Sequence, residues 1–183
     1  MTGVATQARW GMGPDTKTDF EQIFEALARA NVQYVIVGGV AVLLQGHPRF
    51  TADLDLVVAL EPANALRAIQ ALDSLDYRPR APVDAASFAD PTVRRQWIEE
   101  KGLTVFSMWS TQFPATEVDI FVAEPMPFDQ IWKNADKASV GDVEVAVASV
   151  PDLIAMKERA GRPKDLQDVA ELRKLLAMRE HDR

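Results

Sequence analysis

Residues 35–58 read VIVGGVAVLLQGHPRFTADLDLVV, and this stretch is the most informative part of the chain. An apolar segment ends at Gly38-Gly39, a short apolar helix follows, and a second apolar segment carries Asp53 and Asp55. Alternate residues of a strand point the same way, so we expect the two aspartates on one face, with Cα atoms about 7 Å apart. Neighbouring carboxylates repel each other unless a cation or a proton compensates them. Oxygen ligands of this kind suit Mg²⁺, so the stretch predicts a divalent-metal site.

The bulk composition limits the class of protein. The chain has 183 residues, 48% of them hydrophobic, which fits one domain with an ample core and excludes disorder throughout. The absence of cysteine removes disulfides, zinc–thiolate sites and thiol nucleophiles. No apolar run approaches the ~20 residues of a membrane span, and the N-terminus lacks the order of a signal peptide. The sequence therefore predicts a cytoplasmic protein without a membrane partner.

The charge is acidic overall but unevenly distributed. The net charge is −7, and such a protein is not a general nucleic-acid binder by its field alone. Residues 157–183 hold eight Lys or Arg and six Asp or Glu, a net of +2, so the rest of the chain carries −9. We expect bound anions to meet the C-terminal segment.

Hydrophobic periodicity predicts the organisation of the chain. Residues 1–14 show no period and are interpreted as a flexible arm. Asp15 or Thr16 is then expected to cap a helix, because Phe20, Ile23, Phe24 and Leu27 recur at i, i+3, i+4 and i+7. Strands are expected at 33–37, 52–60, 103–109 and 117–123, a hairpin at 137–140 with 143–148, and helices at 40–45, 62–75 and 84–100, the last broken at Pro91. A helix from Ser149 to Gly161 and another from Pro163 follow. The fold class is thus α+β: a mixed β-sheet packed with helices over residues 15–148, then a C-terminal helical hairpin over 149–183.

The glycine pair is the first candidate for ligand binding. Without Cβ atoms, Gly38 and Gly39 let the backbone approach a ligand closely, and at a helix N-terminus they would present N–H groups to phosphate. Taken alone, a tight strand-to-helix turn explains the pair more simply. Arg49 and Thr51 precede the two aspartates, and each either binds phosphate or supports the loop.

A third carboxylate would be needed for a two-metal site. Asp119 is the candidate, because it lies in the apolar segment EVDIFV at 117–122, with Glu117 on the same face. If this strand neighbours the one with Asp53 and Asp55, Asp119 completes the cluster. A buried acid satisfied by local hydrogen bonds is an equally good explanation of Asp119.

Basic residues gather where the last two helices meet. Lys157, Arg162 and Lys164 could clamp a triphosphate or balance an acidic site. The alternative is a solvated helix turn in which Lys164 pairs with Asp168 at i, i+4. Trp109, at a strand end, could stack on a base, although such an aromatic more often belongs to a core or its rim.

The order of these pieces resembles the nucleotidyltransferases of the DNA polymerase β superfamily. More narrowly, it is similar to the stand-alone nucleotidyltransferases related to the toxins of abortive-infection toxin–antitoxin pairs. The resemblance covers the chain from about residue 20 to 176. Its most specific parts are GGVAVLLQGHPRFTADLDLVV at 38–58, EVDIFV at 117–122 and DLIAMKERAGRPKDLQDVAEL at 152–172.

The resemblance implies an enzyme that moves a nucleoside monophosphate from a nucleoside triphosphate (NTP) to an acceptor hydroxyl. The acceptor would belong to RNA such as tRNA, to a protein or to a small molecule, and an antitoxin would be a partner. By motif, Asp53, Asp55 and Asp119 are the catalytic acids that hold two Mg²⁺ ions. The nucleotide-binding positions are Gly38, Gly39, Arg49, Thr51, Lys157, Arg162 and Lys164, and the supporting positions are Asp165 and Asp168.

Two other functions compete with this interpretation. A non-catalytic nucleotide-binding or interaction module could use the same fold, although the presence of all three acids disfavours a degenerate site. A sugar-nucleotide-dependent glycosyltransferase also uses D-x-D with a metal, but it gives no reason for Gly38-Gly39 or for Asp119. A P-loop phosphotransferase is excluded because the chain lacks GxxxxGK[ST].

Overall fold

A computed structural model describes residues 17–181 of the chain. The arm expected at 1–14 and the helix caps expected at Asp15 or Thr16 lie outside these residues. Within the described part, seven strands form one mixed sheet in the order β3-β4-β5-β2-β1-β7-β6. The strands are β1 (Tyr34–Val37), β2 (Leu54–Val58), β3 (Tyr77–Pro79), β4 (Val105–Ser110), β5 (Val118–Phe121), β6 (Asp136–Val140) and β7 (Val143–Val147).

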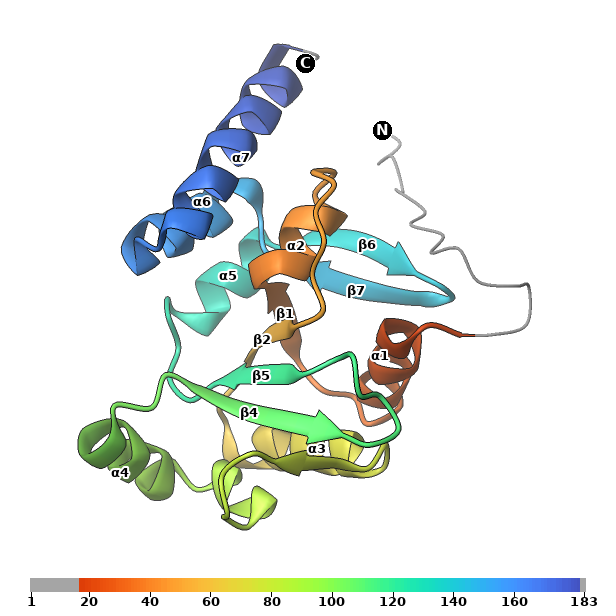
Figure 1. Ribbon diagram of the computed structural model, residues 1–183, viewed down its shortest axis with the longest axis vertical. Coiled ribbons are helices and arrows are strands. Elements are labelled where there is room, and N and C mark those ends of the chain that lie inside the picture. The colour runs from red at the N-terminus through yellow and green to blue at the C-terminus, as the bar shows by residue number, and fades with distance from the viewer. Residues whose placement is uncertain (1–16, 182–183) are drawn as a thin grey trace.

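Helices pack around this sheet (Figure 1). They are α1 (Asp19–Arg29), α2 (Gly38–Leu44), α3 (Pro62–Asp73), α4 (Pro91–Lys101), α5 (Phe128–Asn134), α6 (Val150–Ala160) and α7 (Pro163–His181), with a short 3₁₀ helix η1 (Ala85–Ala89). Helices α1 and α3 pack against each other, and α6 and α7 form a hairpin that stands beyond α2. The predicted α+β class, with a mixed sheet, helices and a C-terminal helical hairpin, is confirmed.

Local signals explain where several helices begin and end. Helix α1 begins after Thr18, whose hydroxyl accepts from the Glu21 N–H while the Glu21 carboxylate accepts from the Thr18 N–H. This capping box satisfies two backbone donors that the first helical turn leaves unpaired. Ser149 caps α6 as expected, and Gly161 ends it in the left-handed conformation, with φ of 65°.

The core lies between the sheet and its helices. All four residues of β1 are buried, and Ile23, Phe24 and Leu27 of α1 are fully buried, as their helical spacing predicts. Among residues 17–181, no helix is both long enough and apolar enough to cross a membrane.

Three details of the sequence prediction need correction. Strand β2 begins at Leu54, so Asp53 precedes the strand that was expected at 52–60. Strand β3 and helix α5 were not predicted, because three residues are too few to show a period and α5 spans only two turns. Glu117 likewise precedes β5, and it pairs with Arg80.

Candidate functional site

Two acids meet where β2 and β5 run side by side. These strands are parallel, and Asp55 is the register partner of Asp119. Directly opposed residues of neighbouring strands project from the same face of a sheet, so both carboxylates face one side. On the other side of β2, Val37 at the end of β1 pairs with Asp55. The glycine pair that follows Val37 is therefore brought against Asp55.

Both positions need glycine, because other side chains lie where a Cβ atom would be. Gly38 has a φ of 64°, and a Cβ atom on it would lie 1.9 Å from Asp55 Oδ2. A Cβ atom on Gly39 would lie 2.5 Å from Thr51 Oγ1. The Gly39 N–H also lowers the pKa of the neighbouring Asp55 carboxylate. The elbow therefore supports an acid directly, a role that the sequence did not predict for its amides.

The acidic pair is poorly compensated. Burial and then the Asp119 charge raise the pKa of Asp55 from 3.8 to about 6, against the lowering effect of the Gly39 N–H. Burial also raises the pKa of Asp119, although Ser107 Oγ donates to Asp119 Oδ1 at 2.5 Å. A cation between the two carboxylates would relieve both their mutual repulsion and the cost of their burial.

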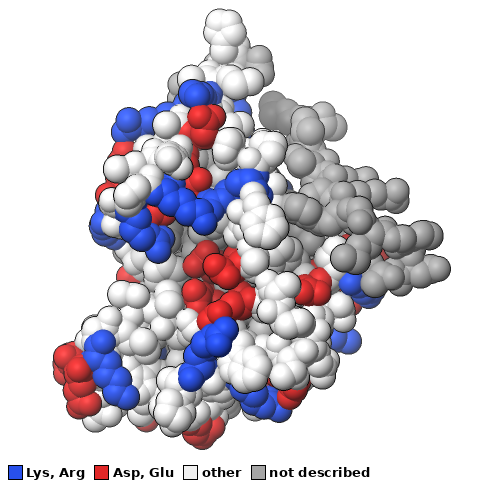
Figure 2. Space-filling model, in the orientation of Figure 1, with Lys and Arg blue, Asp and Glu red and all other residues white. Residues whose placement is uncertain are grey.

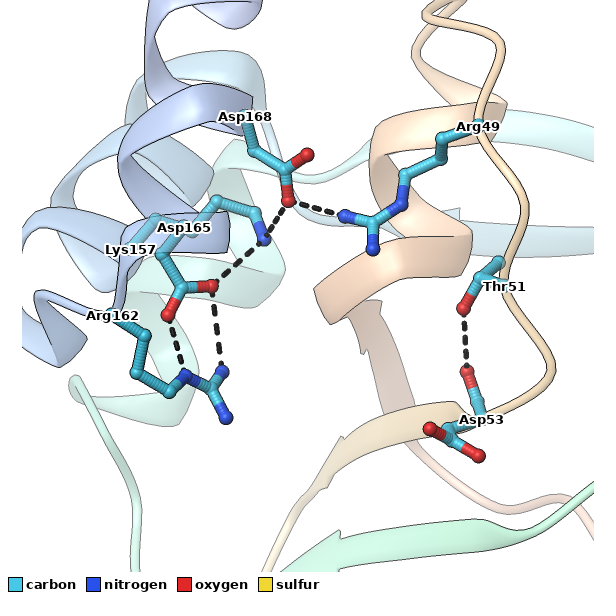
Figure 3. A network of polar contacts seen from close by, with 7 residues as sticks. All are labelled: Arg49, Thr51, Asp53, Lys157, Arg162, Asp165 and Asp168. Carbon is cyan, nitrogen blue, oxygen red and sulfur yellow. Dashed lines mark hydrogen bonds and ion pairs between the residues drawn. The ribbon is translucent and has the colours of Figure 1, made fainter.

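Asp53 is near enough to this pair for its charge to raise the pKa of both Asp55 and Asp119. It is exposed, and its carbonyl oxygen accepts from the Thr51 hydroxyl at 3.3 Å (Figure 3). Within residues 17–181, no three carboxylate or imidazole groups are placed so that they hold a metal ion together. The donor chemistry nevertheless fits Mg²⁺, which usually takes one or two protein carboxylates and fills its remaining positions with water and substrate phosphate.

One cavity joins all of the predicted positions. Its volume is about 670 Å³, and Figure 2 shows an acidic patch in a hollow below a band of basic side chains. The walls include Gly38, Gly39, Arg49, Thr51, Asp53, Asp55, Asp119, Lys157, Arg162, Lys164, Asp165 and Asp168. Residues separated by more than a hundred positions in the chain therefore surround a single space large enough for a nucleotide-sized ligand.

The basic side of the cavity is a network of ion pairs (Figure 3). The buried Lys157 Nζ lies 2.7 Å from Asp168 Oδ2 and 3.4 Å from Asp165 Oδ1. Asp168 also accepts from Arg49, and Arg162 Nε lies 2.6 Å from Asp165 Oδ2. Asp168 thus binds Lys157 and Arg49, from α6 and from the loop after α2.

This network changes the roles expected of its members. Asp168 does not form the i, i+4 pair with Lys164 that was considered as an alternative. Three cations, Arg49, Lys157 and Arg162, face two carboxylates, which leaves a net charge of +1 before the exposed Lys164 is counted. Lys157 is compensated twice within the protein, so the charge available to an anion lies at Arg49, Arg162 and Lys164.

One residue beside the acids, Arg80, was not predicted from the sequence. Arg80 pairs with Glu117 and lies over the Trp109 ring, beside the acids. The sequence did carry a signal for the face of β4 on which Trp109 lies, because Val105, Ser107 and Trp109 alternate with buried residues. Arg80 gave no signal, because it follows β3, the strand that the sequence did not predict.

Comparison with known proteins gives a family and a fold. The family model described as Nucleotidyl transferase AbiEii toxin, Type IV TA system, matches residues 23–181. A search of the curated proteins finds no match. The lincomycin-bound lincosamide antibiotic adenylyltransferase LnuA is similar in structure, with a TM-score of 0.57 and 15% identity over 88% of this chain and 99% of that one.

The antibiotic-resistance factor ANT(2'')-Ia is also similar. Its solution structure has a TM-score of 0.54 and 15% identity over 88% of this chain and 90% of that one. Its crystal structure with adenylyl-2''-tobramycin has a TM-score of 0.53 and 15% identity over 90% and 97%. At such identities the likeness establishes the fold alone, which the structure of residues 17–181 shares.

Proposed function

Because the chain belongs to the AbiEii family of nucleotidyltransferase toxins, we propose that it transfers a nucleoside monophosphate from an NTP to an acceptor hydroxyl. The acceptor would belong to RNA such as tRNA, to a protein or to a small molecule, and the chain would be the toxin of a toxin–antitoxin pair. One observation carries the proposal: Asp55 and Asp119 lie side by side in the cavity that the glycine elbow and the basic network enclose.

The acids supply the reacting centre in this proposal. Asp55 and Asp119, with Asp53 at the rim of the same cavity, would hold the two Mg²⁺ ions, whose charge would offset that of the transferred phosphoryl group and of the departing pyrophosphate. Asp119 would also take the proton of the acceptor hydroxyl, because its carboxylate lies beside Asp55 in this cavity.

The opposite wall binds the triphosphate. Arg162 and Lys164 are exposed at the start of α7, and Arg49 reaches the cavity from the loop after α2. Their excess positive charge suits an anionic tail. Asp165 and Asp168 hold Lys157 and the two arginines in place, so these acids act as positioning residues.

Pyrophosphate release tests the proposal. Each NTP is incubated with Mg²⁺ and with labelled RNA, protein or small-molecule acceptors, and the label is followed. Asp55→Asn should retain the circular dichroism spectrum and lose about 10²-fold or more in transfer rate, because an acid of the reacting centre is removed. Glu99→Gln makes the same acid-to-amide change on the exposed face of α4 and should transfer at the parent rate.

The outcomes separate the proposal from its alternative. Equal transfer rates in Asp55→Asn and in the parent would contradict the assignment of Asp55. Binding of an NTP by the parent without release of pyrophosphate for any acceptor would support a non-catalytic nucleotide-binding or interaction module. For the toxin role, expression in cells should arrest growth with the parent and not with Asp55→Asn.

A further inference from the structure

Strand β4 carries a second group of side chains on the face that holds the acids. Ser107 and Trp109 alternate with the buried Phe106 and Met108, so both point to the side where Ser107 contacts Asp119. The Trp109 side chain is 40% exposed. An indole ring therefore lies open to solvent one strand away from Asp119, on the same face of the sheet.

Arg80 is the second component of this surface, and an ion pair with Glu117 holds it in place. Arg80 donates from Nε and Nη2 to the two Glu117 carboxylate oxygens at 2.8 and 2.9 Å. Its guanidinium carbon lies 5.9 Å from the centroid of the Trp109 ring. The two parallel hydrogen bonds fix the guanidinium plane, and the two charges cancel. Trp109, Arg80 and Glu117, which we call the β4 platform, thus combine two planar groups with no net charge.

The β4 platform lines a cavity of its own. Its volume is about 350 Å³, and its wall includes Asp53, which also lines the larger cavity. The two cavities therefore share an acid of the reacting centre. In the sheet order, β5 and then β4 lie on one side of β2, whereas the basic network stands on α6, α7 and the loop after α2. Figure 2 shows basic side chains on both sides of the acidic patch.

The geometry of phosphoryl transfer gives the platform a role. The attacking and leaving oxygens lie roughly in line through the transferred phosphorus. If pyrophosphate departs toward the basic network, the acceptor hydroxyl approaches from the opposite side of the acids. The β4 platform and its cavity lie on that side.

Resting on the proposed function, we propose that the β4 platform is the acceptor subsite and that it takes an unpaired base at the end of a single-stranded RNA. Aromatic rings and guanidinium planes are the surfaces on which splayed bases stack in proteins. A neutral platform offers no net charge to attract a charged peptide. The overall charge of −7 also opposes a long phosphate backbone, so stacking of the terminal base carries the contact.

A binding measurement tests the subsite without any turnover. Asp55→Asn is titrated into a short single-stranded RNA that ends in 2-aminopurine, whose fluorescence falls when the base stacks. Adding Trp109→Ala should weaken binding about 5- to 150-fold, the range that base–aromatic stacking implies, whereas Trp109→Phe should keep most of it. Trp132→Ala is the matched control, because Trp132 is 38% exposed and has Lys137 Nζ 5.3 Å from its ring centroid.

Kinetics with Asp55 intact provide the second readout. Trp109→Ala should raise the KM for the RNA acceptor and leave the KM for the NTP unchanged. The subsite would be overturned if the Asp55→Asn chain with Trp109 intact did not quench the 2-aminopurine fluorescence. It would also be overturned if Trp109→Ala and Trp132→Ala weakened RNA binding equally. Transfer to a protein acceptor that Trp109→Ala leaves intact would also overturn it, while the proposed function stands. Quenching that depends on Trp109 in a chain that transfers nothing would support the base-binding subsite and overturn the proposed function.

Discussion

Asp55→Asn should stabilise the protein at neutral pH while it removes activity. A rise in the pKa of Asp55 from 3.8 to about 6 corresponds to about 3 kcal/mol between the folded and unfolded states. This is an upper bound, because the residue is only half-buried and solvent screens part of the effect. The charged carboxylate costs the folded protein this free energy, and an amide does not.

The sign of the effect fixes its pH dependence. The folded pKa of Asp55 lies above its unfolded value, so the contribution of this group to stability is complete below about pH 4 and is lost as the pH rises through about 6. The asparagine side chain of the variant does not titrate, so the variant escapes that loss. The free energy of unfolding of the variant should therefore exceed that of the parent by up to about 3 kcal/mol at pH 7.5, with a difference near zero at pH 4.

Urea unfolding with EDTA present, at several pH values from 4 to 8, measures this difference. A separate thermal melt at pH 7.5 should show a melting temperature that is higher by up to about 6–12 °C in the variant, and Mg²⁺ should stabilise the parent more than the variant. Glu99→Gln should change stability by less than about 0.5 kcal/mol at every pH. A variant less stable than the parent at pH 7.5, or a gain that does not vary with pH, would refute the reasoning about the uncompensated acidic pair.

Two further pairs of substitutions test the elbow and the basic network. Gly38→Ala should unfold at a lower urea concentration than Gly102→Ala and should lose nucleotide binding in calorimetry, because the new Cβ atom meets Asp55 at position 38, whereas nothing lies within 4 Å of Gly102. Both positions have φ near 60°, so backbone strain is matched, and equal destabilisation would show that the contact with Asp55 is relieved at no cost. Lys157→Met should cost about 1.5–3 kcal/mol of stability, because two buried carboxylates lose their shared cation while each keeps one arginine partner. Lys164→Met should weaken NTP binding in calorimetry and leave urea unfolding unchanged, and the reverse ranking would contradict the roles given to the two lysines.

Local patterns predicted the elements of this fold well where the pattern was long or capped. The period of Phe20, Ile23, Phe24 and Leu27 gave α1, and Ser149 with Gly161 gave both ends of α6. The cap of α1 was expected at Asp15 or Thr16, but Thr18 with Glu21 forms the capping box. Such signals act within a few residues, so they can be found without knowledge of the rest of the chain.

Local sequence patterns predicted acids at or beside two strands, a glycine pair at an elbow and a basic segment in a helical hairpin. Which of these residues meet depends on long-range packing: the register of β2 with β5 sets Asp55 beside Asp119, and the packing of α7 on α6 sets Lys157 between Asp165 and Asp168. Long-range packing also placed Arg80 over Trp109, a contact that no pattern indicated. The physical reason is that strand pairing and helix docking depend on the whole core, whereas propensity and periodicity are properties of neighbouring residues.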